Sequence, residues 1–276
     1  MLDLAPAGLD RLSLNQMTLD QWGLEEVIDG CVRAGVEWIG PWRHKVQEVG
    51  LEEAARMVAD SGLKVSSYCR GGFFPVFEHE IAERRDDNRR AIDEAAALGT
   101  DVLVLVCGAS IDKDIESARR MVVEGIAELV PYARDAGVRL GIEPLHPMFA
   151  GDRSVVVTLG QANDMASNFS SADVGVVVDV YHVWWDPALQ SEIERCGKSG
   201  KLFAFHVCDW KTPTKDLLLD RGLPGEGCID IRQIRAWVEA TGFRGPIEVE
   251  IFSEAYWAGD QAELLERVTQ SYLSHV

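Results

Sequence analysis

The sequence lacks the features that mark several classes of protein. It has no apolar run near the roughly 20 residues that a helix needs to cross a bilayer. Its first residues, MLDLAPAG, show neither the basic start nor the apolar stretch of a secretory signal. The six cysteines form no CxxC pair, and in a chain of 276 residues they indicate reduced thiols rather than a disulfide framework. We therefore expect a cytoplasmic protein that has no membrane partner.

Positive charge is also scarce. The chain has 27 Lys and Arg against 45 Asp and Glu, so its net charge is −18. Proteins bind the phosphate backbone of nucleic acids mainly through Lys and Arg. This balance argues against a nucleic-acid partner, and the excess of negative charge is enough to explain solubility.

What the sequence does contain is a regular alternation of strand-like and helix-like segments. Strands separated by helices pair in parallel through right-handed crossovers. Eight such units in 276 residues predict an α/β fold, a single (β/α)₈ barrel domain spanning residues 1–276. An open doubly wound sheet is the alternative, disfavoured because no Gly-x-Gly-x-x-Gly follows the first strand. The expected strands are Arg11–Asn15, Gly35–Gly40, Lys64–Cys69, Asp101–Cys107, Val138–Glu143, Val174–Val180, Leu202–Cys208 and Pro246–Phe252.

Four ionisable residues stand at the ends of the last four strand-like runs. They are Glu143, Asp179, His206 and Glu250. The carboxyl ends of barrel strands meet on one face, where barrel enzymes build their sites, so we expect these side chains to converge. The two longest irregular segments, 143–158 and 209–229, follow strands of this set and are expected on the same face.

Strand periodicity indicates where these side chains point. Successive residues face opposite sides of a strand, so Glu143, His206 and Glu250 point toward the barrel axis if the bulky apolar residues face the helices. Glu248 shares the side of Glu250, and we expect it one layer deeper with a partner of its own. The run before Asp179 is apolar on both faces and indicates no direction. The apolar faces of the other three strands carry Leu140, Ile142, Phe203, Phe205, Val207, Ile247, Val249 and Ile251.

Three carboxylates aimed at one place repel each other unless a positive charge lies between them. One answer is a divalent cation, because carboxylate oxygens with one imidazole suit Mn²⁺, our preferred ion, or Mg²⁺, with Zn²⁺ and Co²⁺ as alternatives. The other answer is pairing with arginines at the rim of the barrel. Arg70 and Arg221 are the candidates for that role.

The segments around these strand ends resemble the sugar phosphate isomerase/epimerase family of the xylose isomerase-like barrel superfamily. That family includes tagatose 3-epimerase-like, hydroxypyruvate isomerase-like and inosose-processing enzymes. The resemblance implies that all four strand-end residues bind one metal ion and that Glu143 and Glu250 also transfer protons. It places His182 and Arg221 in the substrate pocket. The matching segments lie in the C-terminal half: Gly141–Pro144, Asp179–His182, Phe205–Asp209, Asp220–Gly225 and Ile247–Phe252.

Further substrate contacts are expected from side chains that follow the same strands. Trp185 is our preferred residue for stacking on a sugar ring, although aromatic residues there also simply cover a barrel mouth. His146 and Arg153 lie in the long loop after Glu143, where substrate contact and plain solvation remain alternatives. Residues 252–257, FSEAYW, lack the Gly and Lys that phosphate binding favours after the last strand. We therefore expect a neutral sugar, keto-sugar or cyclitol.

Together these features predict a metal-dependent isomerase or epimerase of a keto-sugar or related polyol. A bound cation stabilises the negative charge that develops on oxygen when a proton leaves the carbon next to a carbonyl. One alternative is a lyase, dehydratase or keto-glycoside-cleaving enzyme that uses the same site on a 3-keto sugar, and another is a non-catalytic sugar-binding barrel. DNA repair endonucleases of the superfamily need further histidines, and this chain has none between His79 and His146. A homo-oligomer is left open.

Overall fold

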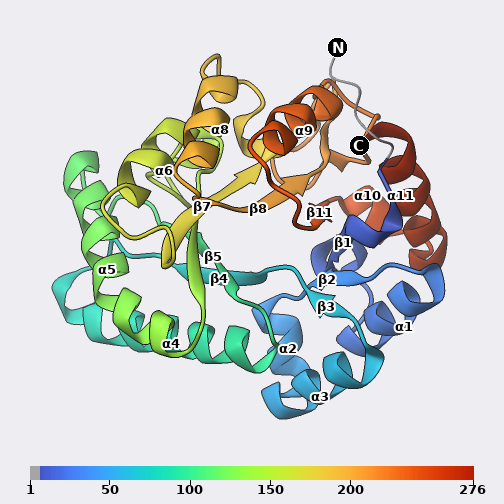
Figure 1. The fold of residues 1–276 in the computed structure, drawn as a ribbon, viewed down its shortest axis with the longest axis horizontal. Coiled ribbons are helices and arrows are strands. Elements are labelled where there is room, and N and C mark those ends of the chain that lie inside the picture. Colours follow the sequence, from blue (N-terminus) through green and yellow to red (C-terminus); the bar gives the residue numbers. More distant parts are fainter. Residues whose placement is uncertain (1–6) are drawn as a thin grey trace.

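The parallel strands curve into a barrel that is enclosed by helices (Figure 1). The structure is a computed structural model that describes residues 7–276. The strands follow one another in the order β3-β2-β1-β11-β8-β7-β6-β5-β4. The two ends of this sheet, β3 and β4, are parts of the third expected strand, separated by Ser66 and Ser67. A parallel bridge from Trp42 to Cys69 continues the pairing past the interruption, so the predicted (β/α)₈ barrel is confirmed.

The barrel strands are short, and each ends at the face that carries the candidate site. They are β1 (Leu12–Asn15), β2 (Trp38–Gly40), β3 (Lys64–Val65), β4 (Tyr68–Gly72), β5 (Val102–Val106), β6 (Arg139–Glu143), β7 (Val174–Asp179), β8 (Leu202–Val207) and β11 (Ile247–Val249). Outside the barrel, β9 (Asp209–Trp210) and β10 (Arg221–Gly222) form an antiparallel ribbon.

Helices connect the strands and cover the outside of the barrel (Figure 1). Several begin at a side chain that caps the free amides of the first turn and end at a left-handed glycine. Thus Asp260 accepts from the amides of Ala262 and Glu263, and α1 ends at Gly35 with φ 71°. The helices are α1 (Leu24–Ala34), α2 (Arg43–Val49), α3 (Leu51–Ser61), α4 (Ile81–Ala97), α5 (Ile115–Asp135), α6 (Leu159–Ala166), α7 (Val180–Val183), α8 (Leu189–Lys198), α9 (Ile231–Ala240), α10 (Glu254–Trp257) and α11 (Gln261–His275). Within residues 7–276, no helix combines the length and apolarity needed to cross a bilayer.

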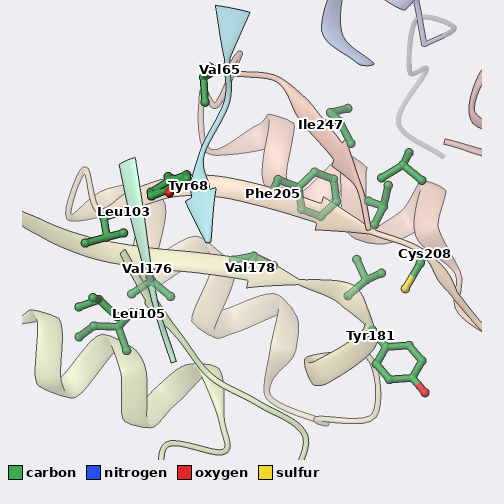
Figure 2. Packing of buried hydrophobic residues seen from close by; sticks show 14 of the residues in the cluster. Val65, Tyr68, Leu103, Leu105, Val176, Val178, Tyr181, Phe205, Cys208 and Ile247 are labelled. Atoms are coloured by element: carbon green, nitrogen blue, oxygen red, sulfur yellow. The ribbon is translucent and has the colours of Figure 1, made fainter. Parts of the chain in front are cut away.

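The strands bury apolar residues on both of their faces. One cluster lies between the strands and the helices, and Figure 2 shows members of it, among them Leu103, Val176 and Phe205. A smaller cluster inside the barrel contains Val177 and Phe203. Because Val177 faces inward, Asp179, two residues later on the same strand, faces inward as well.

The placement of Phe203 corrects the prediction that it shares a face with Phe205. It lies in the inner cluster, whereas Phe205 lies in the outer one. The pairing of β7 with β8 explains the difference, since Val176 pairs with Leu202 and Val177 with Ala204. One extra residue on β8 breaks the strict alternation of side chains, as a β-bulge does. His206 lies beyond the bulge and points inward, as predicted.

Candidate active site

Three of the four predicted strand-end residues come together at the barrel mouth. Glu143 ends β6, Asp179 ends β7, and His206 lies on β8, next to the last residue of that strand. Each offers one ligand atom, and these atoms all lie within 4.8 Å of one another. The parallel register explains the convergence, because Asp179 pairs directly with His206 and neighbouring strands lie side by side.

The polar atoms of this group have few hydrogen-bond partners. Oδ2 of Asp179 and both ring nitrogens of His206 are buried and make no hydrogen bond within residues 7–276. Nδ1 of His206 lies 3.6 Å from Oε1 of Glu143, beyond normal hydrogen-bond distance. Buried polar atoms are normally satisfied, so atoms like these need an explanation such as an ion. Two carboxylates and an imidazole fit a divalent cation.

The carboxylate of Glu250 is engaged by other side chains. Its Oε2 accepts a hydrogen bond from Arg221 at 3.0 Å, and its Oε1 accepts one from Asn15 at 3.1 Å. Arg221 also lies 3.5 Å from Oδ2 of Asp179. The guanidinium therefore bridges two of the acidic residues. This is the arginine pairing that the sequence offered as the alternative to a cation. We call Glu143, Asp179, His206 and Glu250 the acidic cluster.

Glu248 lies deeper in the barrel, as predicted, and has partners of its own. Its Oε1 accepts a hydrogen bond from Asn15 at 2.6 Å, and its Oε2 accepts from the hydroxyls of Ser66 and Ser67 at 2.7 and 2.8 Å. Both serines reach the same carboxylate because they occupy the interruption between β3 and β4. A Cβ atom at Gly40 would clash with this carboxylate, so only glycine leaves room for it.

The charges of the cluster shift its protonation. Burial raises the pKa of Asp179 and Glu250; the guanidinium of Arg221 opposes the rise and repulsion from Glu143 adds to it. Burial disfavours the charged form of His206, but the neighbouring carboxylates overcome this and raise its pKa to about 10. Asp179, His206 and Glu250 therefore hold protons more readily than usual, and a divalent cation would compete with these protons for the same atoms.

The sequence-predicted substrate residues lie around the cluster. The amide of His146 donates to Nδ1 of His182 at 3.2 Å, so neutral His182 carries its proton on Nε2, which lies 3.6 Å from Oδ2 of Asp179. Burial lowers the pKa of His182 well below its ordinary value, which favours this neutral form. Trp185 donates to the carbonyl of His182 at 2.8 Å, and its ring packs edge-on against His146 at 5.5 Å.

Two side chains of the acidic cluster border a cavity of about 560 Å³, open mouth included. Glu143, Glu250, His182 and Arg221 line it, whereas Trp185 and His146 form the aromatic group beside it. The lining includes the rings of Trp42, Phe149 and Phe252 and the guanidinium groups of Arg70 and Arg153. Carboxylates, an imidazole and aromatic rings around one cavity are suited to a small molecule rich in hydroxyl groups.

Asn15 is a residue of this site that the sequence reasoning missed. It links Glu248 to Glu250, and its Oδ1 accepts from the indole of Trp42 at 2.8 Å. It stands at the end of the first strand, so the strand-end rule applied to the later strands would have found it. Ser66 and Ser67 gave no such signal, because nothing in their sequence indicates that the strand is interrupted there.

Comparisons with known proteins agree with this geometry. The family model described as xylose isomerase-like TIM barrel matches residues 28–268. The 3-dehydroshikimate dehydratase of Pseudomonas aeruginosa is 29% identical over 248 residues, which cover 85% of this chain and 37% of that enzyme. The inosose isomerase of Halalkalibacterium halodurans is 28% identical over 170 residues, which cover 60% of this chain and 58% of that enzyme. The chain thus spans a third to just over half of the length of these relatives.

Solved structures show the same barrel. Protein SMc04130 from Sinorhizobium meliloti 1021 is 50% identical, with a TM-score of 0.94 over 97% of this chain and 98% of that one. The IOLI protein, solved with a binding zinc atom, has a TM-score of 0.83 over 96% of this chain and 97% of its own. The two sequences are 21% identical, so this similarity shows a shared fold and nothing further.

Proposed function

Given that this chain belongs to the xylose isomerase-like TIM barrel family, we propose that it is a divalent-cation-dependent isomerase or epimerase of a keto-sugar or related polyol. The proposal depends above all on one observation. Glu143, Asp179 and His206 bring ligand atoms within 4.8 Å of one another at the mouth of a barrel, beside a cavity that a second glutamate, Glu250, also lines.

The acidic cluster is the proposed site of the cation, with Mn²⁺ as the preferred ion because hard carboxylate oxygens predominate among its donors. A cation held there would act as a Lewis acid toward the oxygens of the substrate. The atoms of Asp179 and His206 that make no hydrogen bond support this assignment, as does the zinc atom in the structure of the IOLI protein. A cation that also engaged Glu250 would share this carboxylate with the guanidinium of Arg221.

Proton transfer is assigned to the two glutamates that line the cavity. A base that works near neutral pH is most efficient when its pKa lies near that pH, and burial shifts the pKa of Glu250 in this direction. In the proposed reaction, one glutamate removes a proton from the carbon next to the carbonyl and the other returns one. Return to the opposite face of the same carbon epimerises it, and return to the neighbouring carbon exchanges aldose and ketose.

Arg221 and His182 are proposed to hold the substrate in place. Arg221 is buried beside Asp179 and Glu250, with its guanidinium 4.3 Å from the ring centre of Tyr181. His182, with its proton on Nε2, is a donor at the edge of the cavity. Trp185 and His146 are proposed to support the wall of the cavity behind His182, because Trp185 donates to the carbonyl of His182 and packs against His146. The proposed partner is thus a small molecule of the sugar class.

The similarity to a 3-dehydroshikimate dehydratase supplies a competing outcome. Dehydration of a β-hydroxy ketone begins with the same proton removal, but the electrons then expel the β-oxygen as water once it has taken up a proton. The inosose isomerase relative supports the isomerase reading. The two reactions differ in what leaves the site, so product analysis separates them.

Proton exchange from D₂O tests the proposal. The protein is loaded with Mn²⁺ and offered D-fructose, D-allulose, an inosose and 3-dehydroshikimate, and both deuterium incorporation and products are followed by NMR. Exchange at the carbon next to the carbonyl of a sugar or cyclitol, with an isomer or epimer as product, is the expected result. Exclusive loss of water from 3-dehydroshikimate would replace the proposal by a dehydratase, and a metal-loaded protein that exchanges no proton from these compounds or from charged ketoses would refute both.

Metal content provides the matched control. We expect about one Mn²⁺ per chain after dialysis, and loss of that ion in Glu143→Gln. Glu266→Gln, on the outer helix α11, removes the same charge and leaves the metal in place. Equal metal content in all three proteins would remove Glu143 as a ligand.

A further inference from the structure

Arg70 faces the cavity without a carboxylate partner. It lies on β4 and lines the cavity. Its guanidinium lies 4.4 Å from the ring centre of Phe73 and 6.0 Å from that of Trp42. Within residues 7–276, no carboxylate forms an ion pair or hydrogen bond with it. Most other arginines of this acidic chain are paired; Arg43, for example, binds both Asp87 and Glu94.

Arg153 lines the same cavity from the loop that follows β6. Its guanidinium lies 5.4 Å from the ring centre of Phe149, and its Nε makes no hydrogen bond in the described chain. Its one ion pair is a long contact of 3.5 Å with Asp152, which is 63% exposed. Exposed pairs of this kind contribute little, so the charge of Arg153 is largely available to the cavity. We call Arg70 and Arg153 the arginine pair.

Both arginines are held in place by the end of β5. The amide of Phe73 donates to the carbonyl of Val106 at 2.7 Å, which fixes the segment after Arg70. The amide of Gly108 donates to the carbonyl of Arg153 at 2.9 Å. Phe149 packs in one small apolar cluster with Val106, and Phe73 packs against that cluster. The rings beneath the two guanidinium groups are therefore parts of one packed unit, and the arginine pair is organised before any ligand binds.

Two like charges at one cavity carry a cost that a ligand can remove. Burial lowers the pKa of Arg70, and repulsion from Arg153 acts in the same direction, whereas attraction to the carboxylate of Glu143 opposes the shift in part. The lining of the cavity thus includes two carboxylates of the acidic cluster, those of Glu143 and Glu250, with Arg221 paired to Glu250, and also the arginine pair. Guanidinium groups bind carboxylate and phosphate through charge-assisted hydrogen bonds, often in pairs. A neutral sugar leaves their charge uncompensated.

We propose that the arginine pair binds an oxyanion at one end of the substrate, so that the substrate is a keto-sugar carrying a carboxylate or a phosphate group. This inference rests on the proposed function and replaces the neutral substrate expected from residues 252–257. The anion binds between Arg70 and Arg153, while the keto and hydroxyl oxygens at the other end of the molecule meet the acidic cluster. The two opposite charges fix the direction in which the substrate enters.

The test compares ketoses that differ in one terminal group. D-fructose, D-fructuronate and D-fructose 6-phosphate carry a hydroxymethyl, carboxylate and phosphate group at the same carbon, and D-tagatose provides a second such series. Deuterium exchange gives kcat/KM for each. We expect the charged member to exceed its neutral counterpart by about 10- to 100-fold, as one or two charge-assisted hydrogen bonds provide. Whether carboxylate or phosphate is faster identifies the anion.

Variants show whether the arginine pair causes the preference. In Arg70→Met and in Arg153→Met, the ratio of charged to neutral kcat/KM should fall by about 10-fold or more, mainly through KM, and Arg70→Lys should recover part of it. Arg89→Met is the control, because Arg89 also lies over an aromatic ring, 5.4 Å from the centre of Tyr132, but outside the cavity. Thermal unfolding of each variant verifies folding.

The outcomes separate this inference from the proposed function. Exchange that is equally fast for charged and neutral ketoses would overturn the inference and leave the isomerase proposal standing. So would a ratio that persists in both methionine variants. A folded, metal-loaded protein that exchanges no proton from any of the six ketoses would overturn the proposed function, and this inference with it.

Discussion

Asn15 provides a quantitative test of how the acidic residues are held in the barrel. Its Nδ2 donates to Glu248 at 2.6 Å and to Glu250 at 3.1 Å. Its Oδ1 accepts from the amide of Met17 and from the indole of Trp42. Asn15→Asp keeps the size and both acceptor contacts but replaces the donor by a third carboxylate. A hydrogen bond to a charged group contributes about 1.5–3 kcal/mol, so losing both should lower the free energy of unfolding by about 3–6 kcal/mol at neutral pH.

The loss should grow with pH. The introduced carboxyl is buried beside two carboxylates, so its pKa in the folded protein lies above its unfolded value of about 4. The folded variant then binds more protons than its unfolded form between these two pKa values, and its stability falls as pH rises through that window. At acid pH the introduced group carries a proton and can donate to Glu248 or Glu250, as Asn15 does.

Urea unfolding followed by circular dichroism, from pH 5 to pH 8, measures this dependence. Asn15→Leu is the comparison: it removes the donor and both acceptor contacts without adding charge, so its loss should vary little with pH. In the double variant Asn15→Asp with Glu248→Gln, the amide of the introduced glutamine can donate to the introduced aspartate. This variant should recover about half of the lost free energy of unfolding. A destabilisation below about 1 kcal/mol, or an equal and pH-independent loss in the Asp and Leu variants, would refute the reasoning.

Three further predictions concern the same architecture. Gly40→Ala should lower the free energy of unfolding by about 1–3 kcal/mol, because the added methyl group displaces Glu248 from its hydrogen bonds; unchanged urea unfolding would show that the carboxylate can move at no cost. Arg43→Met should lower the free energy of unfolding by about 1–3 kcal/mol above pH 5. Burial opposes ionisation of Asp87, but Arg43 holds the pKa of this carboxyl below its ordinary value. The stabilisation is therefore present above the unfolded pKa, and the difference in free energy of unfolding between variant and wild type should close as pH falls below 4. A difference that persists there would contradict this account. Mn²⁺ at 100 times its Kd should stabilise the protein by about 2.7 kcal/mol, and a chelator should reverse this; a thermal midpoint indifferent to both would argue against the cation site.

The barrel and the inward direction of Glu143, His206 and Glu250 could be predicted from the sequence, because strand periodicity and the strand-end rule act locally. Asp179 could not be assigned a direction from its own apolar strand, and the inner position of Val177, two residues earlier, supplied it. Phe203 was assigned to the wrong face because a bulge depends on how two strands pair, which a single strand does not reveal.

The partners of the site residues were harder to predict than the residues themselves. Asn15 donates to carboxylates 233 and 235 positions away, and Arg221 reaches Glu250 and Asp179 from a ribbon outside the barrel. Such contacts depend on how distant elements close around one axis. Charge counting reveals that the carboxylates need compensation, but it does not say whether a cation, an arginine or an amide supplies it.

The segments that carry Arg70 and Arg153 are attached to the end of β5. This attachment separates the choice of substrate from the residues assigned to the reaction. The groups assigned to proton transfer and metal binding lie at the ends of β6, β7, β8 and β11, whereas the arginine pair depends on β4, β5 and the loop after β6. Mutation of one set leaves the backbone supports of the other in place. Related barrels can therefore change which substrate they prefer by altering two side chains, without changing the residues assigned to metal binding and proton transfer.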